Sequence, residues 1–472
     1  MNIFEYFKKN GIATVDTSFY RQIEKWKSWY VGNVRGFSSY RVYNGRGQYI
    51  RRQRKSLGMA KMVCEDIADL LLNEKVAFTL SDEKTHDYVV NVLDRNRFFK
   101  MGNEYQERKA ACGTVAYVGY VENGVIDADG YLIDGDIGIN YVSAENIFPT
   151  SWTNGKVTEC IFAFPRTVGR EKYIQLQNHH LVDGMYVIEN TVLQQIDGSR
   201  EGRELEPDDW KEIPAFENLA EIIYTESNKP QFVIDTLAIT NNVDIDESNP
   251  MGVSIFANAL DVLKVIDIVY DSYSNEYEIG KKRLFTAPEM LKNVDGTPAF
   301  DPDDTVFYML PQEYSDKDGI EPIKEINPEL RENAHSDAIN RNLNYLSMKC
   351  GFGTDRYNFE GGAVKTATEV ISENSDMYRR MKKHEQSLDA AIKELIRMII
   401  RMGNAMGHQL NEDTEIIIDF DDSIIEDKQA ERNMDRTDVA IGAMPLWEYR
   451  AKWYNEDEAK AKSMVDMEEV ME

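Results

Sequence analysis

The feature that most limits how this chain folds is a long stripe of apolar residues near its middle. Apolar side chains recur every three or four positions from Val253 to Tyr277. This spacing predicts an α-helix, and about 24 residues at roughly 1.5 Å each extend over about 36 Å. Asn249 and Pro250 precede the stripe as a predicted N-cap and first helical residue, and Gly280 follows it as a predicted stop. We therefore expect one helix that is longer than the average globular helix.

A second long helix is predicted after a short intervening segment. Residues 281–326 contain several prolines and Asp/Gly turns, which favour a small module of short strands. Asn327 and Pro328 then repeat the helix-start pattern, and Gly351 ends the helical stretch. Two long helices that flank one small module are expected to run antiparallel beside each other.

The rest of the chain predicts both helices and strands, so we expect an α+β fold. Residues 19–30 have the apolar spacing of an amphipathic helix, and the Gly- and Arg-rich residues 32–47 are interpreted as a loop. Residues 113–239 contain short β-rich runs separated by turns, which is typical of an antiparallel sheet. A Thr-x-x-Glu capping box at Thr366 precedes a predicted helix that extends to about Met402.

The charge balance disfavours a protein that grips nucleic acid. The chain has 54 Lys and Arg residues against 82 Asp and Glu residues, which gives a net charge of −28. Proteins that neutralise DNA phosphates are basic, so the balance argues against a sequence-specific DNA binder but not against a smooth conduit. The tail from residue 411 onward is especially acidic, and its pattern predicts helices that carry Trp447 and Trp453.

No motif in the sequence points to catalysis or to a bound metal. The four cysteines lie far apart without a CxxC pair, and there is no Walker A, HExxH, GxSxG or kinase motif. Neighbouring residues in a strand point to opposite faces, so His179 and His180 are not expected to share a metal. Neither a secretory signal nor a stretch of about 18 apolar residues is present, so no membrane helix is predicted. We expect neither an enzyme nor a bound cofactor.

Two alternative functions remain open on these observations alone. Asp419 and Asp421 follow a predicted strand and would share one face, as the carboxylates of metal-dependent nucleases do. No partner pair of acidic residues or histidines stands out elsewhere in the sequence. The long helices are also compatible with a helical cytosolic scaffold protein that binds partners.

Several segments, in order along the chain, together resemble one protein family. Trp26, Trp29, Tyr30 and Gly32 form a W-x-x-W-Y-x-G pattern, which an amphipathic run ending in DIADLLLNEK follows. The later segments read NNVDIDESNPMGVSIFANALDVLKVIDIVYDSYSNEYEIGKKR and, after a Gly-rich stretch, K-TATEV and SDMYRRMKKHE. In this series the chain resembles portal proteins of long-tailed bacteriophages that infect Gram-positive bacteria. The resemblance covers most of the chain and is weakest over residues 120–240 and in the acidic C-terminus.

This resemblance implies an elongated fold of several parts and a ring with a central channel. The parts expected are a wing over 1–248 and 352–410, stem helices over 249–280 and 327–350, a clip over 281–326, a tunnel loop over 351–365 and a crown over 411–472. Twelve copies would sit at one capsid vertex, where a terminase pumps double-stranded DNA in and the genome later leaves toward the tail. The ring would thereby join head to tail.

The resemblance also implies partners and a place in the virion. The implied partners are the terminase large subunit, a head-completion adaptor, the major capsid and scaffold proteins, and double-stranded DNA that passes without sequence specificity. No membrane is involved. Assembly would take place in the cytoplasm of the bacterial host.

Three groups of site residues follow from that role. Packing between stems is expected for Phe256, Leu260, Leu263, Ile266 and Tyr270. Docking at the clip is expected for Phe300, Asp303, Asp304, Phe307 and Tyr308. The channel contacts are expected in the tunnel loop at Asp355, Arg356, Tyr357, Asn358, Phe359 and Glu360.

Packing geometry agrees with a channel for DNA. Twelve helices whose axes lie ~10 Å apart around a circle leave a hole ~28 Å across. A B-form duplex, about 20 Å across, would pass with little slack. An anionic wall cannot grip a polyanion, so the DNA would slide.

Overall fold

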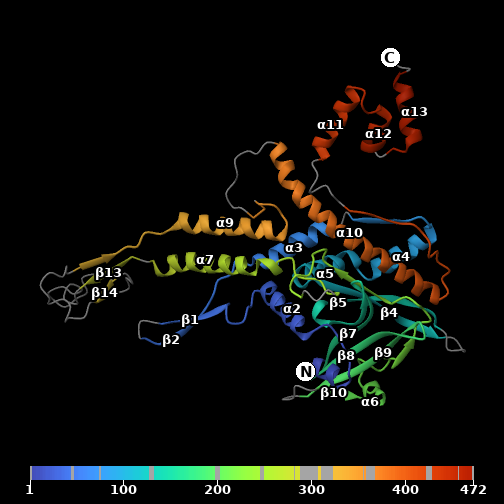
Figure 1. The fold of residues 1–472 in the computed structure, drawn as a ribbon, viewed down its shortest axis with the longest axis horizontal. Helices are drawn as coiled ribbons and strands as arrows, with labels where there is room; N and C mark the ends of the chain where they lie inside the picture. Colours follow the sequence, from blue (N-terminus) through green and yellow to red (C-terminus); the bar gives the residue numbers. More distant parts are fainter. Residues whose placement is uncertain are drawn as a thin grey trace.

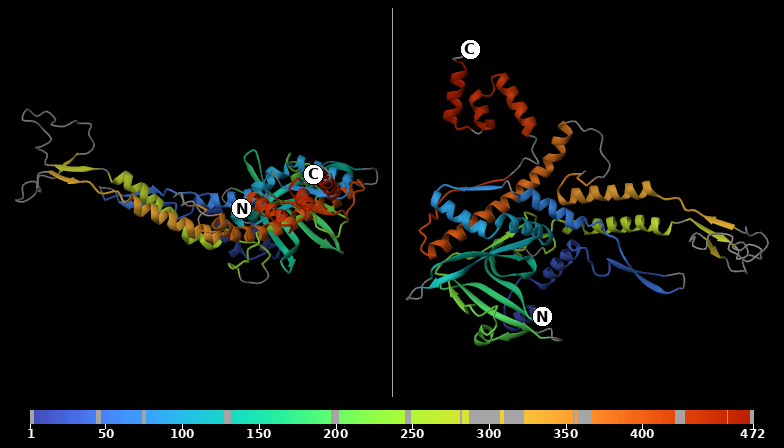
Figure 2. Two further views of the ribbon diagram at one scale, coloured as in Figure 1. Left: turned by 90° about the horizontal axis from the view of Figure 1, so that it is seen from above. Right: turned by 180° about the vertical axis from the view of Figure 1, so that it is seen from behind.

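The computed structural model is an elongated molecule in which a stem projects from a larger body (Figures 1 and 2). It describes residues 3–43, 47–73, 76–126, 132–196, 202–244, 249–280, 282–286, 307–309, 323–354, 356–357, 367–420, 428–454 and 456–469. Helices and mostly antiparallel sheets occur together, which confirms the expected α+β class. Within these ranges, no helix is both long enough and apolar enough to cross a membrane.

Helices form one part of the body. They are α1 (Ile3–Lys9), α2 (Thr17–Tyr30), α3 (Met59–Leu71), α4 (Glu83–Arg95), α5 (Phe98–Cys112) and the long α10 (Ala367–Ala405). The predicted amphipathic helix is confirmed as α2, whose first turn is capped by the side chain of Asp16. The predicted helix that ends near Met402 is confirmed as α10. Thr366, its predicted cap, lies outside the described residues.

Antiparallel strands form the other part of the body, as the sequence predicted for residues 113–239. One sheet has the order β10-β9-β8-β7-β6, and β11 also pairs with β9. A second sheet has the order β12-β4-β5. The strands are β4 (Thr114–Ile126), β5 (Leu132–Ser143), β6 (Ile147–Thr153), β7 (Lys156–Val168), β8 (Glu171–Val182), β9 (Met185–Gln195), β10 (Gly202–Leu205), β11 (Ile222–Tyr224) and β12 (Phe232–Thr236). A short helix, α6 (Pro207–Lys211), follows β10.

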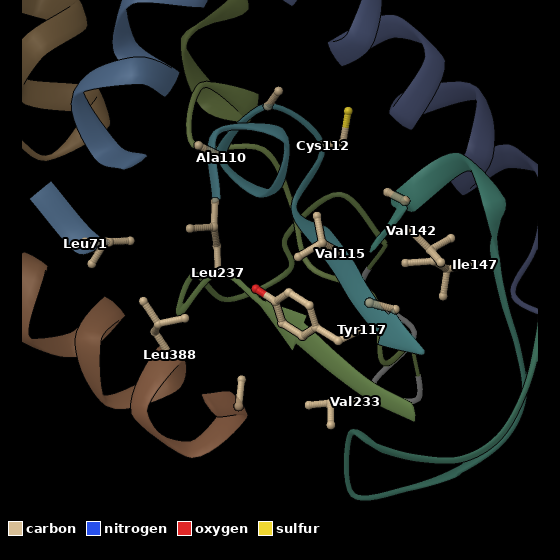
Figure 3. Close-up of a cluster of buried hydrophobic side chains, with 14 of the residues drawn as sticks. Leu71, Ala110, Cys112, Val115, Tyr117, Val142, Ile147, Val233, Leu237 and Leu388 are labelled. Carbon is tan, nitrogen blue, oxygen red and sulfur yellow. The ribbon is translucent and has the colours of Figure 1, made fainter. Parts of the chain in front are cut away.

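The core lies where the helices meet the second sheet. Figure 3 shows side chains from α3, α5, β4, β12 and α10 that converge on this region, among them Leu71, Tyr117 and Leu388, each fully buried. A buried ion pair crosses the same junction, because Lys109 of α5 lies 2.9 Å from both carboxylate oxygens of Asp235 of β12. The body is therefore one packed unit in which α10 is tied to the N-terminal helices.

A β-hairpin occupies part of the segment that the sequence predicted to be a loop. Strand β1 (Ser39–Tyr43) pairs antiparallel with β2 (Tyr49–Gln53). The loop prediction for residues 32–47 was therefore wrong from Ser39 to Tyr43. The missed signal was an Asn-Gly step between two short runs of tyrosine and β-branched residues, with Tyr40, Val42 and Tyr43 before it and Tyr49 and Ile50 after it.

The first stem helix, α7 (Leu260–Ile279), ends before Gly280 as predicted but begins ten residues after the predicted start at Pro250. Met251, Gly252 and Val253 are buried in non-helical conformation against the end of α5. The Gly252 N–H donates to Thr114 Oγ1 at 2.9 Å, and the Ile255 N–H donates to the Ala110 carbonyl at 2.9 Å. These contacts satisfy the backbone of the segment, so it has no need of helical hydrogen bonds. A 3₁₀ turn at Ala257–Ala259 then leads into the helix.

The second stem helix, α9 (Glu332–Cys350), also begins after its predicted start, since residues 327–331 are not helical. Its end at Gly351 is confirmed. Gly351 has φ +98°, and the N–H groups of Gly351 and Phe352 donate to the Ser347 carbonyl at 3.0 and 2.9 Å. This closing turn requires a left-handed residue, which explains the glycine.

The small module and the acidic tail agree with their predictions within the described residues. At the far end of the stem, β13 (Arg283–Thr286) pairs parallel with β14 (Phe307–Met309) and antiparallel with β15 (Ile323–Ile326). The strand predicted near Asp419 is β16 (Ile416–Asp419), which pairs with β3 (Ala77–Leu80). Three helices follow it, α11 (Lys428–Ala440), α12 (Leu446–Tyr454) and α13 (Glu458–Glu469).

Candidate functional site: the stem, its far end and the segment after it

The two stem helices run antiparallel and are tied to each other at both ends (Figure 1). Near the small module, Arg331 pairs with Glu276, and His335 Nε2 lies 3.2 Å from the same carboxylate. Hydrogen bonds from Arg331 lower the pKa of Glu276 to about 2. Near the body, Lys349 Nζ lies 3.1 Å from Asp261. These ties, with apolar contacts between them, make the projecting pair a defined rod rather than two loose helices.

The residues predicted to pack between subunits are largely buried inside this one subunit. Phe256, Leu263 and Ile266 are no more than 2% exposed, and Leu260 and Tyr270 are half-buried. For the three fully buried residues the prediction needs correction. The stripe faces α9 and the body, so its central apolar side chains have no surface left to offer a neighbour.

Other apolar side chains of the stem remain exposed. Val265 and Ile268 of α7 are 42% and 41% exposed, and Tyr345 and Met348 of α9 are 54% and 49% exposed. Their spacing places Val265 and Ile268 on a second face of α7. The sequence analysis did not single out these exposed residues. The run VLKVIDIVY is apolar on more than one helical face, and this pattern could have indicated a second apolar face on the helix.

At the far end of the stem, the described strands carry an exposed tyrosine beside a half-buried arginine. Tyr308 is 45% exposed, its ring centroid lies 5.5 Å from that of Phe285, and the Arg283 guanidinium lies 5.9 Å from the Tyr308 ring. Of the other predicted docking residues, Phe307 lies in β14. Phe300, Asp303 and Asp304 lie outside the described residues.

The start of the Gly-rich segment folds back onto the body. Tyr357 is 5% exposed, and its hydroxyl donates to Asp66 Oδ2 of α3 at 2.7 Å. Burial and the adjacent carboxylate raise the pKa of Tyr357 well above its ordinary value. Arg356 Nη2 lies 3.3 Å from the other oxygen of Asp66. Tyr357 is therefore an anchor in this subunit and does not supply free bulk to a channel, which corrects its predicted role.

The remaining predicted channel residues are not part of this anchor as described. Asp355, Asn358, Phe359 and Glu360 lie outside the described residues. Arg356 and Tyr357, which both contact Asp66, fix the position of the chain shortly after the end of α9. Nothing in the sequence around Tyr357 distinguishes a buried tyrosine from an exposed one, because the partner, Asp66, lies 291 positions away.

The described residues do not assemble the site that a metal-dependent nuclease needs. Asp419 is exposed at the end of β16, opposite Ala77, and Asp421 lies outside the described residues. No group of three or more potential metal ligands occurs among the residues that the structure describes. His179 is fully buried while His180 is half-buried, as expected for neighbours on opposite faces of a strand.

Comparison with known proteins yields one family and 71 matching chains of solved structures. A family model described as "Phage portal protein, SPP1 Gp6-like" matches residues 11–470. A chain of the solved structure "Neck of native GTA particle computed with C12 symmetry" is 10% identical, with a TM-score of 0.39, and the match covers 83% of this chain and 88% of that one. No curated protein matches the sequence.

Proposed function

The chain belongs to the SPP1 Gp6-like family of phage portal proteins, and we propose that twelve copies form a ring through which double-stranded DNA enters and leaves the capsid. The observation that carries this proposal is the family match over residues 11–470 of the 472-residue chain. The projecting pair of α7 and α9 supports it, because such rods can surround a channel when copies are arranged about an axis. Portal proteins of this family are structural, so we assign no catalytic residue.

We assign the parts of the ring in the order that the sequence suggested. The body that contains α1–α6 and α10 corresponds to the wing, α7 and α9 to the stem, β13–β15 to the clip, and α11–α13 to the crown. Residues 351–365 correspond to the tunnel loop. In this assignment the crown and the clip lie at different ends of the subunit, as Figure 1 shows for α11–α13 and β13–β14.

Electron microscopy of the purified chain tests the ring directly. Twelve subunits of 54.3 kDa give a mass of about 650 kDa and a ring with an open centre. Rings that assemble without a capsid can differ by a subunit, so a count of thirteen would still support the proposal. A chain that stays monomeric or dimeric at all concentrations would refute it.

The exposed face of α7 is the proposed stem contact between neighbouring subunits. The double substitution Val265→Asp with Ile268→Asp should abolish rings and leave the circular dichroism spectrum unchanged, because both side chains already lie in solvent in the single subunit. Leu181→Asp, at an equally exposed apolar residue of β8, is the matched control and should leave rings intact. By contrast, Leu263→Asp would place a charge inside the subunit and should unfold the stem junction itself.

The tunnel loop is proposed to hold DNA loosely during packaging. Arg356→Glu breaks the contact with Asp66 and removes a cation from the start of the loop, so packaging of full-length genome should fall, most strongly at low salt. Asp66→Asn, which removes the partner but keeps the cation, separates anchoring from charge. If the wild type, Arg356→Glu and Asp66→Asn all package full-length genome equally well, the loop only connects α9 to α10.

The clip is the proposed docking surface, first for the terminase large subunit and later for the head-completion adaptor. Charge reversal at Asp303 and Asp304 should impair packaging or tail joining while rings still form. Normal yields of tailed, DNA-filled particles from that variant would remove the acidic residues from the docking surface. Major capsid and scaffold proteins are the proposed contacts of the wing at the vertex.

A further inference from the structure

The segment that carries the β1–β2 hairpin differs sharply in charge from the rest of the chain. Residues 25–64 contain ten Lys and Arg residues and no Asp or Glu, although the whole chain carries a net charge of −28. The stretch runs from the second half of α2 through the hairpin into the start of α3, and a local run of cations of this kind is the electrostatic footprint expected of a polyanion site. Part of this charge is matched within the subunit, because five of the ten cations lie at ion-pair distance from carboxylates of the stem or body: Lys27, Arg52, Arg54, Lys55 and Lys61.

One face of the hairpin is held against the stem. The Tyr40 hydroxyl donates to Asp271 Oδ2 at 2.8 Å, and Arg52 donates to Asn275 Oδ1 at 3.0 Å. Lys55, two residues after the end of β2, pairs with Glu278. Figures 1 and 2 show the hairpin beside α7, on the side away from α9. The contacts with the acidic side of α7 therefore fix the position of the hairpin relative to the stem.

The opposite face of the hairpin points away from these contacts and is rich in cations and phenols. Arg41 lies directly across from Arg51, and Tyr43 lies directly across from Tyr49. Because side chains alternate along a strand, these pairs share the face that Tyr40 and Arg52 do not occupy. Tyr43 and Tyr49 are 65% and 62% exposed, and both arginines are exposed.

The two arginines face each other without an acidic neighbour. Within the described ranges, neither Arg41 nor Arg51 has a carboxylate at ion-pair distance, and Arg51 donates to Ser39 Oγ at 2.9 Å. Like charges directly opposite in a sheet are unfavourable. An external anion that bridges both guanidinium groups would turn this repulsion into attraction.

We propose that this face of the hairpin, formed by Arg41, Arg51, Tyr43 and Tyr49, binds the phosphate backbone of double-stranded DNA without reading its sequence. Guanidinium groups bind phosphate through two parallel N–H donors, and tyrosine hydroxyls are common phosphate donors. The choice of DNA as the polyanion rests on the proposed portal function, whereas the preference for phosphate rests on the hairpin alone. A contact with a carboxylate-bearing surface of a second copy is the competing occupant.

The test compares the full-length wild-type chain with Arg41→Glu/Arg51→Glu and with the charge-conserving Arg41→Lys/Arg51→Lys. Fluorescence anisotropy with a labelled 30-base-pair duplex, titrated at several salt concentrations, measures affinity and the salt slope. Electron microscopy of the same samples counts rings. Each phosphate contact contributes about 0.9 to the slope, so the charge-reversed variant should bind about tenfold or more weakly with a slope smaller by about 2. The lysine variant should keep the slope.

Two results would overturn the inference. Unchanged affinity and slope in the charge-reversed variant would remove DNA from this face. Loss of rings in that variant, with rings retained by the lysine variant, would assign the face to a contact between copies. Failure of the wild-type chain to form any ring would instead count against the portal ring itself, and the anisotropy comparison would still decide whether the hairpin binds phosphate.

Discussion

The buried ion pair between Lys109 and Asp235 should be the most sensitive polar contact in the body. The two side chains are 1% and 0% exposed, and Asp235 also accepts a hydrogen bond from Gln106 Nε2 at 2.8 Å. Burial lowers the pKa of Lys109, although the adjacent carboxylate opposes that shift. The pair joins α5 to β12, and α10 packs on the same junction through the hydrogen bond from Ser387 Oγ to the Thr236 carbonyl.

Lys109→Met removes the cation and leaves the carboxylate buried with mainly an amide donor. Breaking a buried pair in this way costs about 3–5 kcal/mol, a large part of the ~5–15 kcal/mol that stabilises a typical domain. Adding Asp235→Asn removes the unpaired charge, so the double variant should recover most of the loss. The free energy of unfolding is measured in urea by tryptophan fluorescence for the wild type, both single variants and the double variant.

The double-mutant cycle distinguishes loss of the ion pair between Lys109 and Asp235 from loss of side-chain packing at each position. An interaction free energy of about 2 kcal/mol or more between the two positions is expected, because each charge is tolerated only with the other present. A Lys109→Met variant within about 1 kcal/mol of wild type would refute the reasoning. So would a double variant whose loss equals the sum of the single losses.

Three further predictions concern other parts of the fold. Burial lowers the pKa of His384 to about 4 and that of His179 to about 3, below the value of about 6.5 expected in the unfolded chain. Protonation therefore favours the unfolded chain, so the stability associated with the neutral histidines is complete above about pH 6.5 and is lost as the pH falls toward 4. The urea concentration at the unfolding midpoint should decrease over this pH range, and it should decrease less in His384→Gln. Gly113→Ala places a Cβ 2.3 Å from the Gly252 carbonyl oxygen at φ +87°, and calorimetry should show a loss of at least about 1–3 kcal/mol. Tyr449→Phe removes the acceptor of two arginine side chains in the C-terminal helices, so limited proteolysis should cut between α11 and α12 faster while ring formation persists.

The sequence by itself determined that two long helices exist and where each one ends. A repeat of apolar residues at three and four positions identified α7, and the Asn-Pro start pattern together with Gly351 identified α9; both are local properties of the sequence. Gly280 and Gly351 mark the two helix ends, and at Gly351 the reason is also local, since a closing turn with positive φ favours glycine. The antiparallel sheet and the helical tail followed from the same kind of local pattern.

The beginnings of those helices depended on distant segments. Asn249 and Pro250 have the composition of a helix start, yet the Asn249 side chain accepts from the Met251 N–H at 2.9 Å in a turn outside the helix. The next residues are held by α5 and β4, which lie more than 130 positions earlier in the chain. No pattern within the segment reports a hydrogen-bond partner at that distance.

The direction in which each apolar or polar side chain points was also decided by the tertiary structure. Leu263 and Val265 are both apolar residues of one helix, but α9 and the body cover Leu263 and leave Val265 in solvent. Tyr357 is buried against α3, where Asp66 accepts a hydrogen bond from its hydroxyl. Arg41 and Arg51 are exposed because α7 takes the other face of the hairpin. Periodicity sets which residues share a face of a helix or strand, whereas only the packing of remote segments sets which face is left for a partner.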